Sequence, residues 1–175
     1  MISVKMSLID GGRMPKQATE GSAGMDLYAR IDHRMSMYAL GLDKKYYPFR
    51  LVGEGNTDLS PSKYLIVLPG ETIIIPVGFR VELPKGYEMQ VRPRSGNSAK
   101  TKIRIANSPG TIDSDYRGEV GVIVDNIGDE PIIIFDGDRI AQAVIQEVPS
   151  VSLEQVDSLE LKTNRGEGGF GSTGV

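Results

Sequence analysis

Short apolar runs interrupted by glycine and proline constrain the fold of this chain more than any other feature. Several runs alternate apolar with polar residues, which is the period of a β-strand with one buried face. The separators, such as 68–71 (LPGE) and 136–138 (DGD), have the composition of turns. The pattern therefore predicts an all-β sandwich or barrel. The runs occupy residues 2–8, 64–68, 72–77, 79–83, 87–91, 120–124, 132–135 and 140–148.

Helical pattern is weak throughout the chain. The only candidate is one or two turns that begin near Ser95 and continue through Asn97 to Lys100. Its position is informative because the first turn of a helix has free backbone N–H groups that can bind an anion. We therefore expect at most one short helix, beside a candidate anion site.

Composition argues against several kinds of active site. The chain has no cysteine, so it can form neither a disulfide framework nor a Cys-ligated metal site. Its single histidine, His33, argues against a Ser-His-Asp triad or a His-rich metal site. The net charge of −3 argues against a broad basic face for nucleic acid, although local arginines can still bind an anionic substrate.

Length and hydropathy indicate one soluble domain. A chain of 175 residues can bury a core of its own as a single domain. No apolar run approaches the roughly 20 residues that a membrane-spanning helix needs. The first residues, MISVK, lack the basic and then apolar pattern of a signal peptide. We therefore expect a cytoplasmic protein that binds neither a membrane nor nucleic acid directly.

The segment 110–120 (GTIDSDYRGEV) carries the most concentrated chemistry in the chain. It places two aspartates and a tyrosine between two apolar strands, with Gly110 and Gly118 where the chain must turn or approach a neighbour closely. One interpretation is a hairpin that holds a small molecule, with Asp113 as a catalytic base. The other is a surface turn, in which Asp, Ser and Gly are common.

Five motifs in this chain resemble, in order, the five motifs of the trimeric deoxyuridine triphosphatase (dUTPase) family. They are residues 23–27 (AGMDL), 93–96 (PRSG), 110–120, 139–142 (RIAQ) and 165–174 (RGEGGFGSTG). Each string is short enough to occur by chance, but all of them in the family's order form a specific match. The resemblance implies a distorted jelly roll or β-barrel over residues 1–160, followed by a glycine-rich, mobile C-terminal arm at 161–175.

The resemblance also implies an enzyme. A dUTPase hydrolyses dUTP to dUMP and pyrophosphate with Mg²⁺ as the cofactor, which keeps uracil out of DNA and supplies dUMP for dTMP synthesis. Its active sites are shared in a homotrimer: one subunit supplies the hairpin, a second the phosphate motifs and a third the C-terminal arm. We therefore expect dUTP as the substrate and further copies of this chain as the partners.

By this resemblance, the third motif supplies the base and the nucleoside slot. Asp113 would orient the water that attacks the α-phosphorus, and Tyr116 would pack under the deoxyribose and exclude a 2′-hydroxyl. Apart from the resemblance, Asp113 can also be a turn carboxylate that caps an N–H, and Tyr116 a core tyrosine at the end of a strand. The pyrimidine slot, whose backbone groups would select uracil, comprises Asn107, Gly110, Thr111 and Ile112.

The second and fourth motifs would bind the triphosphate. Arg94, Ser95 and Gly96 would supply a guanidinium, a hydroxyl and an open backbone. Gln142 would grip a phosphate through its amide; without the resemblance it is an ordinary polar residue of a strand. Many family members continue the second motif with Leu and Ala, whereas this chain has 97–99 (NSA), which puts the local packing in doubt.

Asp26 resembles the carboxylate of the first motif. The resemblance implies that it influences the metal through water or braces the site. In the family Mg²⁺ is held chiefly by the triphosphate and by water, which suits an ion that dehydrates reluctantly. We therefore expect no direct protein ligand to the metal.

The C-terminal arm has two interpretations. Its composition, with five glycines among residues 165–174, is typical of a disordered terminus. By the resemblance it is instead a lid whose single aromatic residue stacks on the base and whose polar residues bind the γ-phosphate. The lid residues are Arg165, Gly169, Phe170, Gly171, Ser172 and Thr173.

Two other functions are open. A dCTP deaminase has the same fold, but that branch carries Arg-Ser-Ser and a catalytic glutamate in the hairpin, whereas this chain has Gly96 and Asp113. The second alternative is a nucleotide-sensing regulator that binds protein partners. The insertion at 32–63, expected to form a β-hairpin arm or an ordered loop, is the candidate surface for such a partner.

Overall fold

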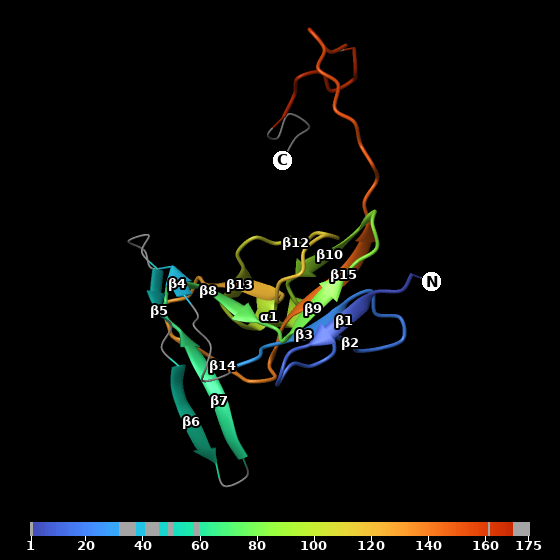
Figure 1. Cartoon of the computed structure of the whole chain (residues 1–175). Coiled ribbons are helices and arrows are strands. Elements are labelled where there is room, and N and C mark those ends of the chain that lie inside the picture. Colours follow the sequence, from blue (N-terminus) through green and yellow to red (C-terminus); the bar gives the residue numbers. More distant parts are fainter. Residues whose placement is uncertain are drawn as a thin grey trace.

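The computed structural model describes residues 2–31, 38–40, 46–48, 51–57, 60–160 and 162–169. Within these ranges the chain consists of strands β1–β15 and one short helix, α1 (Ser95–Lys100) (Figure 1). The prediction of an all-β fold with at most one short helix is therefore confirmed, and the helix begins at the predicted residue. No helix in the described part of the chain is long and apolar enough to cross a membrane.

One antiparallel sheet of five strands has the order β12-β10-β15-β3-β2. Its long central strands, β10 (Tyr87–Arg92) and β15 (Arg139–Glu147), pair along the whole of β10. The order makes β12 and β2 the two edges of this sheet. The shorter strands are β12 (Gly110–Ile112), β3 (Met25–Tyr28) and β2 (Lys16–Gln17).

A second five-stranded sheet has the order β11-β13-β8-β4-β5. Its strands are β11 (Ile103–Ile105), β13 (Gly121–Asn126), β8 (Thr72–Pro76), β4 (Tyr38–Leu40) and β5 (Tyr46–Pro48). Beside these sheets, β1 (Lys5–Leu8) pairs with β9 (Phe79–Glu82). The Lys5 ammonium donates a hydrogen bond to Glu82 in this pair and lowers the pKa of that carboxyl.

The remaining sheet, β14-β7-β6, projects from the body as an arm (Figure 1). Strands β6 (Leu51–Thr57) and β7 (Ser60–Val67) form an antiparallel hairpin, and β14 (Ile132–Phe135) pairs with residues 64–67 of β7. The described part of the 32–63 insertion therefore supplies β4, β5, β6 and the first residues of β7.

Alternation along the strands decides which side chains enter the core. In β13, Val122 and Val124 are buried, while Ile123 between them is only partly buried. In β8, Ile73 and Ile75 are buried, whereas Ile74 between them is 51% exposed. Each fully buried aliphatic side chain contributes about 1.5–3 kcal/mol by leaving water. The core cluster draws such side chains from both five-stranded sheets.

The segment 110–120 does not form the hairpin that its sequence predicts. β12 at its start pairs with β10, whereas β13, which follows it, pairs with β8 and β11. The segment therefore crosses from one five-stranded sheet to the other. The hairpin prediction was wrong because apolar alternation marks a strand but does not identify its partner.

Two glycines allow the N-terminal segment to cross the chain just after β8. Gly78 has a φ of +78°, and a Cβ at this position would lie 2.4 Å from the Gly12 Cα. A Cβ on Gly12 would lie 1.9 Å from the Gly78 carbonyl oxygen. That oxygen also accepts a hydrogen bond from the Ile9 N–H at 2.8 Å. The crossing therefore leaves no space for a side chain at either glycine.

Gly78→Ala should destabilise the fold more than Gly86→Ala. Both glycines have positive φ, but a Cβ on Gly86 would meet no atom within 4 Å. Gly86→Ala thus measures the backbone strain alone, about 1–3 kcal/mol, and Gly78→Ala adds overpacking of about 1–3 kcal/mol. Urea unfolding followed by circular dichroism compares the two, and equal free energies of unfolding would contradict the close approach.

Candidate active site

Four of the five motifs lie on neighbouring strands of one sheet, β12-β10-β15-β3. The first motif runs into β3, the second follows β10, the third begins with β12 and the fourth begins β15. Gln142 pairs with Asp26 on one side and with Arg92 on the other, and Gly110 pairs with Val91. Antiparallel pairing therefore gathers segments that lie far apart in the sequence.

Asp26 is a buried carboxylate between two arginines. Only 8% of its surface is exposed. Its Oδ1 accepts a hydrogen bond from Arg94 Nε at 2.8 Å, and its Oδ2 accepts one from Arg139 Nη1 at 3.2 Å. The resemblance implies two roles for Asp26, an influence on the metal through water and the bracing of the site, and this geometry supports the second. It also identifies Arg139, whose side chain is 52% exposed, as a cation of the site to which the sequence analysis gave no role.

The Gln142 amide joins the second motif to the first. Its Nε2 donates a hydrogen bond to the Pro93 carbonyl at 2.9 Å. A Cβ on Gly24 would lie 2.1 Å from Gln142 Oε1, so glycine at this position gives the amide its space. Since Nε2 carries two hydrogens, the bond to Pro93 leaves one that can reach a ligand.

Helix α1 is attached to β15 by Asn97. The Asn97 Nδ2 donates a hydrogen bond to the Arg139 carbonyl at 2.9 Å. Helix α1 thus contacts β15 through a polar side chain at position 97, where many family members have leucine. Ser95 and Gly96 remain exposed in the first turn, and a Cβ on Gly96 would meet nothing within 4 Å. The predicted anion-binding turn is therefore open to solvent.

A pocket of about 270 Å³ is lined by residues of both five-stranded sheets, and we call it the Tyr116 pocket. It contains all of the residues predicted for the nucleoside slot: Asn107, Gly110, Thr111, Ile112 and Tyr116. Its other lining residues come from β8, β10, β13 and the turn before β13, and they were not among the residues predicted for the slot. These are Ile74, Val91, Glu119, Gly121 and Ile123. Strand alternation could have suggested Ile74 and Ile123, which face outward on β8 and β13, but not their proximity to the slot.

Tyr116 is not a core residue. It is 43% exposed, and its hydroxyl donates a hydrogen bond to the Glu119 carbonyl at 2.9 Å. A Cβ on Gly118 would lie 2.3 Å from the Tyr116 hydroxyl oxygen. Glycine at 118 therefore lets the tyrosine ring fold back over its own turn beside the pocket.

Asp113 lies just outside the residues that line the pocket. Its backbone carbonyl accepts a hydrogen bond from the Tyr116 N–H at 3.2 Å, which closes a turn. The residue is exposed, and its carboxylate makes no hydrogen bond or ion pair with any described residue. Asp113 is thus not a capping carboxylate in this structure, and its side chain can reach water.

A second hollow of about 330 Å³ lies beside the arginines, and we call it the Arg94 hollow. Arg94, Asn97 and Arg139 line it together with Thr101, Asp138 and apolar residues of β14. The hollow and the Tyr116 pocket share none of their lining residues. Within one subunit, the candidate phosphate-binding and nucleoside-binding surfaces are therefore separate.

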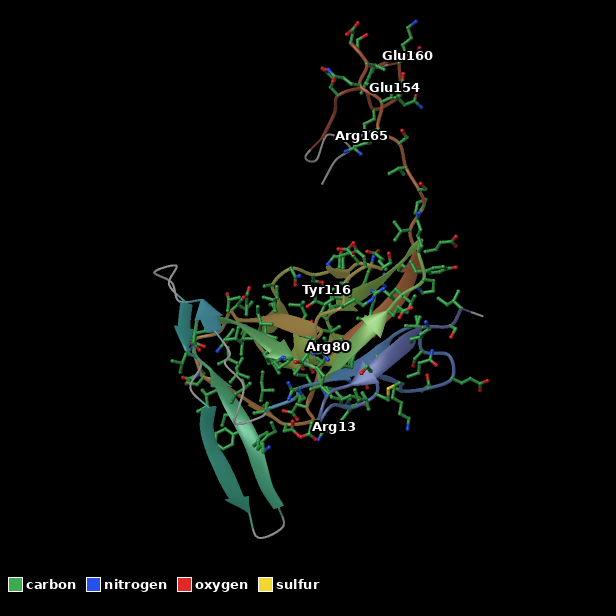
Figure 2. All side chains as sticks on the ribbon, viewed as in Figure 1. Arg13, Arg80, Tyr116, Glu154, Glu160 and Arg165 are labelled. Carbon is green, nitrogen blue, oxygen red and sulfur yellow. The ribbon has the colours of Figure 1, made fainter. Side chains whose placement is uncertain are left out.

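The C-terminal segment leaves the body after β15 and extends away from both sheets (Figure 1). Arg165 lies well away from Tyr116 (Figure 2), and its Nε donates a hydrogen bond to the Gly168 carbonyl at 2.7 Å. The structure therefore does not bring Arg165 or Gly169 to the site of the same subunit. The other predicted lid residues, Phe170, Gly171, Ser172 and Thr173, lie outside the described residues.

The sequence of this chain matches a known protein family. The dUTPase family model matches residues 54–174 of this chain. The "Deoxyuridine 5'-triphosphate nucleotidohydrolase" of Anaplasma marginale is 41% identical over 178 residues, with all of both chains covered.

Solved structures of phage dUTPases share the jelly-roll fold of this chain. The Staphylococcus bacteriophage 80alpha dUTPase, solved with dUPNHPP, has a TM-score of 0.74 and 25% identity, with all of both chains covered. The dUTPase of phage phi11 of S. aureus, in which a structural Mg(II) ion is coordinated, has a TM-score of 0.67 and 21% identity. That comparison covers 91% of this chain and 99% of the phage protein. The jelly-roll prediction is confirmed.

Proposed function

The chain belongs to the dUTPase family and is a dUTP diphosphatase, and from that premise we propose how its residues bind and cleave dUTP. The products would be dUMP and pyrophosphate, so that the reaction keeps uracil out of DNA and supplies dUMP for dTMP synthesis. The observation that carries this proposal is the Tyr116 pocket, which contains every residue predicted for the nucleoside slot.

Uracil would bind along the free edge of β12. This strand is at the edge of its sheet, with β10 on its other side, so its outward N–H and C=O groups have no partner strand. Those groups can pair with the O4, N3 and O2 edge of uracil, as a further strand would. Cytosine presents the opposite pattern at position 4 and would leave buried groups unpaired. A slot that fits uracil closely would leave little space for the 5-methyl group of thymine.

The deoxyribose would pack against the Tyr116 ring. The hydrogen bond from the Tyr116 hydroxyl to Glu119 holds the ring at the pocket. A ring in contact with C2′ leaves no space for a 2′-hydroxyl. Tyr116 would therefore discriminate against ribonucleotides by exclusion.

The triphosphate would bind at the exposed first turn of α1 and the arginines beside it. Asp26 binds Arg94 through Nε, and the Nη2 of Arg94 makes no hydrogen bond with any described residue. That group, the Ser95 hydroxyl, the Gly96 backbone and the free hydrogen of Gln142 Nε2 are the donors for phosphate oxygens. Charge-assisted hydrogen bonds of this kind are about twice as strong as neutral ones.

Asp113 would orient and deprotonate the water that attacks the α-phosphorus. Its carboxylate is exposed and close in sequence to the pocket residues Ile112 and Tyr116. An oriented carboxylate of this kind typically accelerates a reaction by about 10²–10⁴-fold. The bond between the α-phosphorus and its bridging oxygen breaks, and pyrophosphate leaves.

The residues present fit a magnesium ion held by the substrate. Among the described residues, no group of three or more His, Cys, Asp or Glu side chains is placed to hold a metal ion. A triphosphate and waters suit Mg²⁺, which dehydrates reluctantly, and each Asp26 oxygen retains a lone pair that can accept a hydrogen bond from such a water. When bound, the ion would neutralise negative charge on the phosphates.

A complete site would require a homotrimer. The Tyr116 pocket and the Arg94 hollow have separate linings, and Arg165 lies far from Tyr116 of its own subunit (Figure 2). Nucleoside, phosphate and lid surfaces from three copies can converge where those of one copy do not. Residues 161–175 would then form the mobile lid, and Phe170 would stack on uracil while Arg165, Ser172 and Thr173 bind the γ-phosphate.

Wild-type protein with Mg²⁺ should release pyrophosphate from dUTP much faster than from UTP, dTTP or dCTP. Exclusion of a hydroxyl by a fitted apolar surface gives about 10²-fold discrimination, and unpaired polar groups in the slot give more against dCTP. A coupled pyrophosphate assay on the four nucleotides measures this, with ammonia release from dCTP followed in parallel. Equal kcat/KM for dUTP and UTP would contradict the role of Tyr116, and ammonia release would indicate a deaminase.

Asp113→Asn should retain nucleotide binding and lose about 10²–10⁴-fold in kcat. Asparagine preserves the size of the side chain but removes the basic oxygen. The matched control is Asp129→Asn, the same change at another exposed turn, which should leave kcat unchanged. Calorimetric titration with a non-hydrolysable dUTP analogue measures the binding. A normal kcat in Asp113→Asn would exclude it as the base.

Truncation after Glu160 should leave a folded trimer whose kcat is lower by orders of magnitude. Residues 149–160 and 162–167 are exposed, and none of the described residues beyond Glu160 belongs to the core cluster. Light scattering should give three times the mass of the chain for both full-length and truncated protein. An active monomer would contradict the shared site, and full activity in the truncated protein would contradict the lid.

A further inference from the structure

Arg30 is a buried cation that lies outside the proposed site. Only 9% of its surface is exposed, and its guanidinium binds Glu119 through two hydrogen bonds, Nε to Oε1 at 3.0 Å and Nη2 to Oε2 at 3.1 Å. Two parallel bonds restrict the orientation of the carboxylate as well as its distance. The Gly78 N–H donates a further hydrogen bond to Glu119 Oε1 at 3.1 Å. The Glu119 side chain is therefore held from two directions.

Glu119 links this ion pair to the pocket. It lines the Tyr116 pocket, and its backbone carbonyl accepts the hydrogen bond from the Tyr116 hydroxyl at 2.9 Å. The next residue, Val120, is held through both of its backbone groups: its N–H donates to Phe79 O and its carbonyl accepts from Val77 N, each at 3.0 Å. The carbonyl that positions the tyrosine thus belongs to a residue that is anchored at its side chain and is followed by a residue anchored through its backbone.

Arg30 is itself held tightly in place. Its N–H donates a hydrogen bond to the Pro76 carbonyl at 2.9 Å. A Cβ on Gly78 would lie 2.8 Å from Arg30 Cδ, so the glycine crossing makes space for the arginine stem. Arg30 is not among the residues that line the Tyr116 pocket. Glu119, which Arg30 binds, does line the pocket, and it can transmit the position of Arg30 to a bound nucleotide.

We propose that Arg30 is a positioning residue that sets the discrimination between deoxyribose and ribose. The inference rests on the proposed function, in which the Tyr116 ring packs against C2′. Arg30 holds Glu119, the Glu119 carbonyl holds the Tyr116 hydroxyl, and the position of the ring decides how much space remains beside C2′. Loosening the ion pair lets the ring move back and admits a 2′-hydroxyl.

The test is the ratio of kcat/KM for dUTP to kcat/KM for UTP in Arg30→Lys and in Glu119→Gln. Lysine keeps the charge but loses the fork, and glutamine removes the charge but keeps the carbonyl that Tyr116 contacts. Both nucleotides are measured on the same sample, so that a smaller folded fraction cancels from the ratio. We expect a fall of about three- to tenfold in each variant, as for the loss of one net hydrogen bond. An unchanged ratio in both variants overturns the inference.

Arg13→Gln is the control for a lost ion pair. Arg13 Nη2 lies 2.9 Å from Asp136 Oδ2 and also joins distant segments, but neither residue lines the Tyr116 pocket. This variant should keep the wild-type ratio. Tyr116→Phe removes the hydrogen bond to the Glu119 carbonyl altogether, so it gives the largest fall in the dUTP-to-UTP ratio that this bond can cause. The double variant with Arg30→Lys should therefore have the same ratio as Tyr116→Phe alone. Additive losses overturn the inference.

A measurement without nucleotide separates this inference from the proposed function. In protein with isotopically labelled tyrosine, the Tyr116 ring resonance, identified by its loss in Tyr116→Phe, should shift in Arg30→Lys and stay in place in Arg13→Gln. A normal wild-type preference for dUTP with an unmoved resonance overturns the positioning role alone. If wild-type protein does not prefer dUTP over UTP, the proposed function and the sugar-discrimination role both fail.

Discussion

The hydrogen-bond ladders of β10 hold the two candidate binding surfaces together. On one edge of this strand Val91 pairs with Gly110, at the start of the Tyr116 pocket, and on the other edge Arg92 pairs with Gln142. The chain then leaves the strand through Pro93, whose carbonyl accepts the Gln142 amide, and enters α1. A slip of one residue would turn every side chain of β10 to the opposite face. The register of one strand therefore sets where the pocket and the phosphate-binding turn lie relative to each other.

Among the described residues two charged side chains are buried, Asp26 and Arg30, and each forms two hydrogen bonds with side chains of opposite charge. Asp26 receives one guanidinium on each of its oxygens, and Arg30 forms a fork with Glu119. Buried ion pairs of this kind add little net stability, because the loss of hydration offsets the attraction. Their consequence here is geometric. One pair orients Arg94 beside the first turn of α1, and the other anchors the turn that carries Tyr116.

The residues of the Tyr116 pocket differ in how far the sequence could predict them. Gly110 and Tyr116 lie within the third motif and Asn107 lies three residues before it, so that motif also identifies this part of the pocket. Val91 and Ile74 come from strands that meet this segment only in the folded chain. Ile73, Ile74 and Ile75 look alike in the sequence, yet only the middle one faces outward, because alternation fixes opposite faces without saying which is buried.

Local patterns in the sequence determined where most strands and the helix lie, and which short segments carry the chemistry, because strand period, turn composition and motif spacing are properties of neighbouring residues. The tertiary structure alone decided which strands pair. It placed β12 and β13 in different sheets where the sequence predicted a hairpin, and it joined Arg30 to Glu119 and Asp26 to Arg139. Such pairs depend on register and packing between distant segments. No local pattern encodes them, because the free energy of each contact is available only after the sheets have come together.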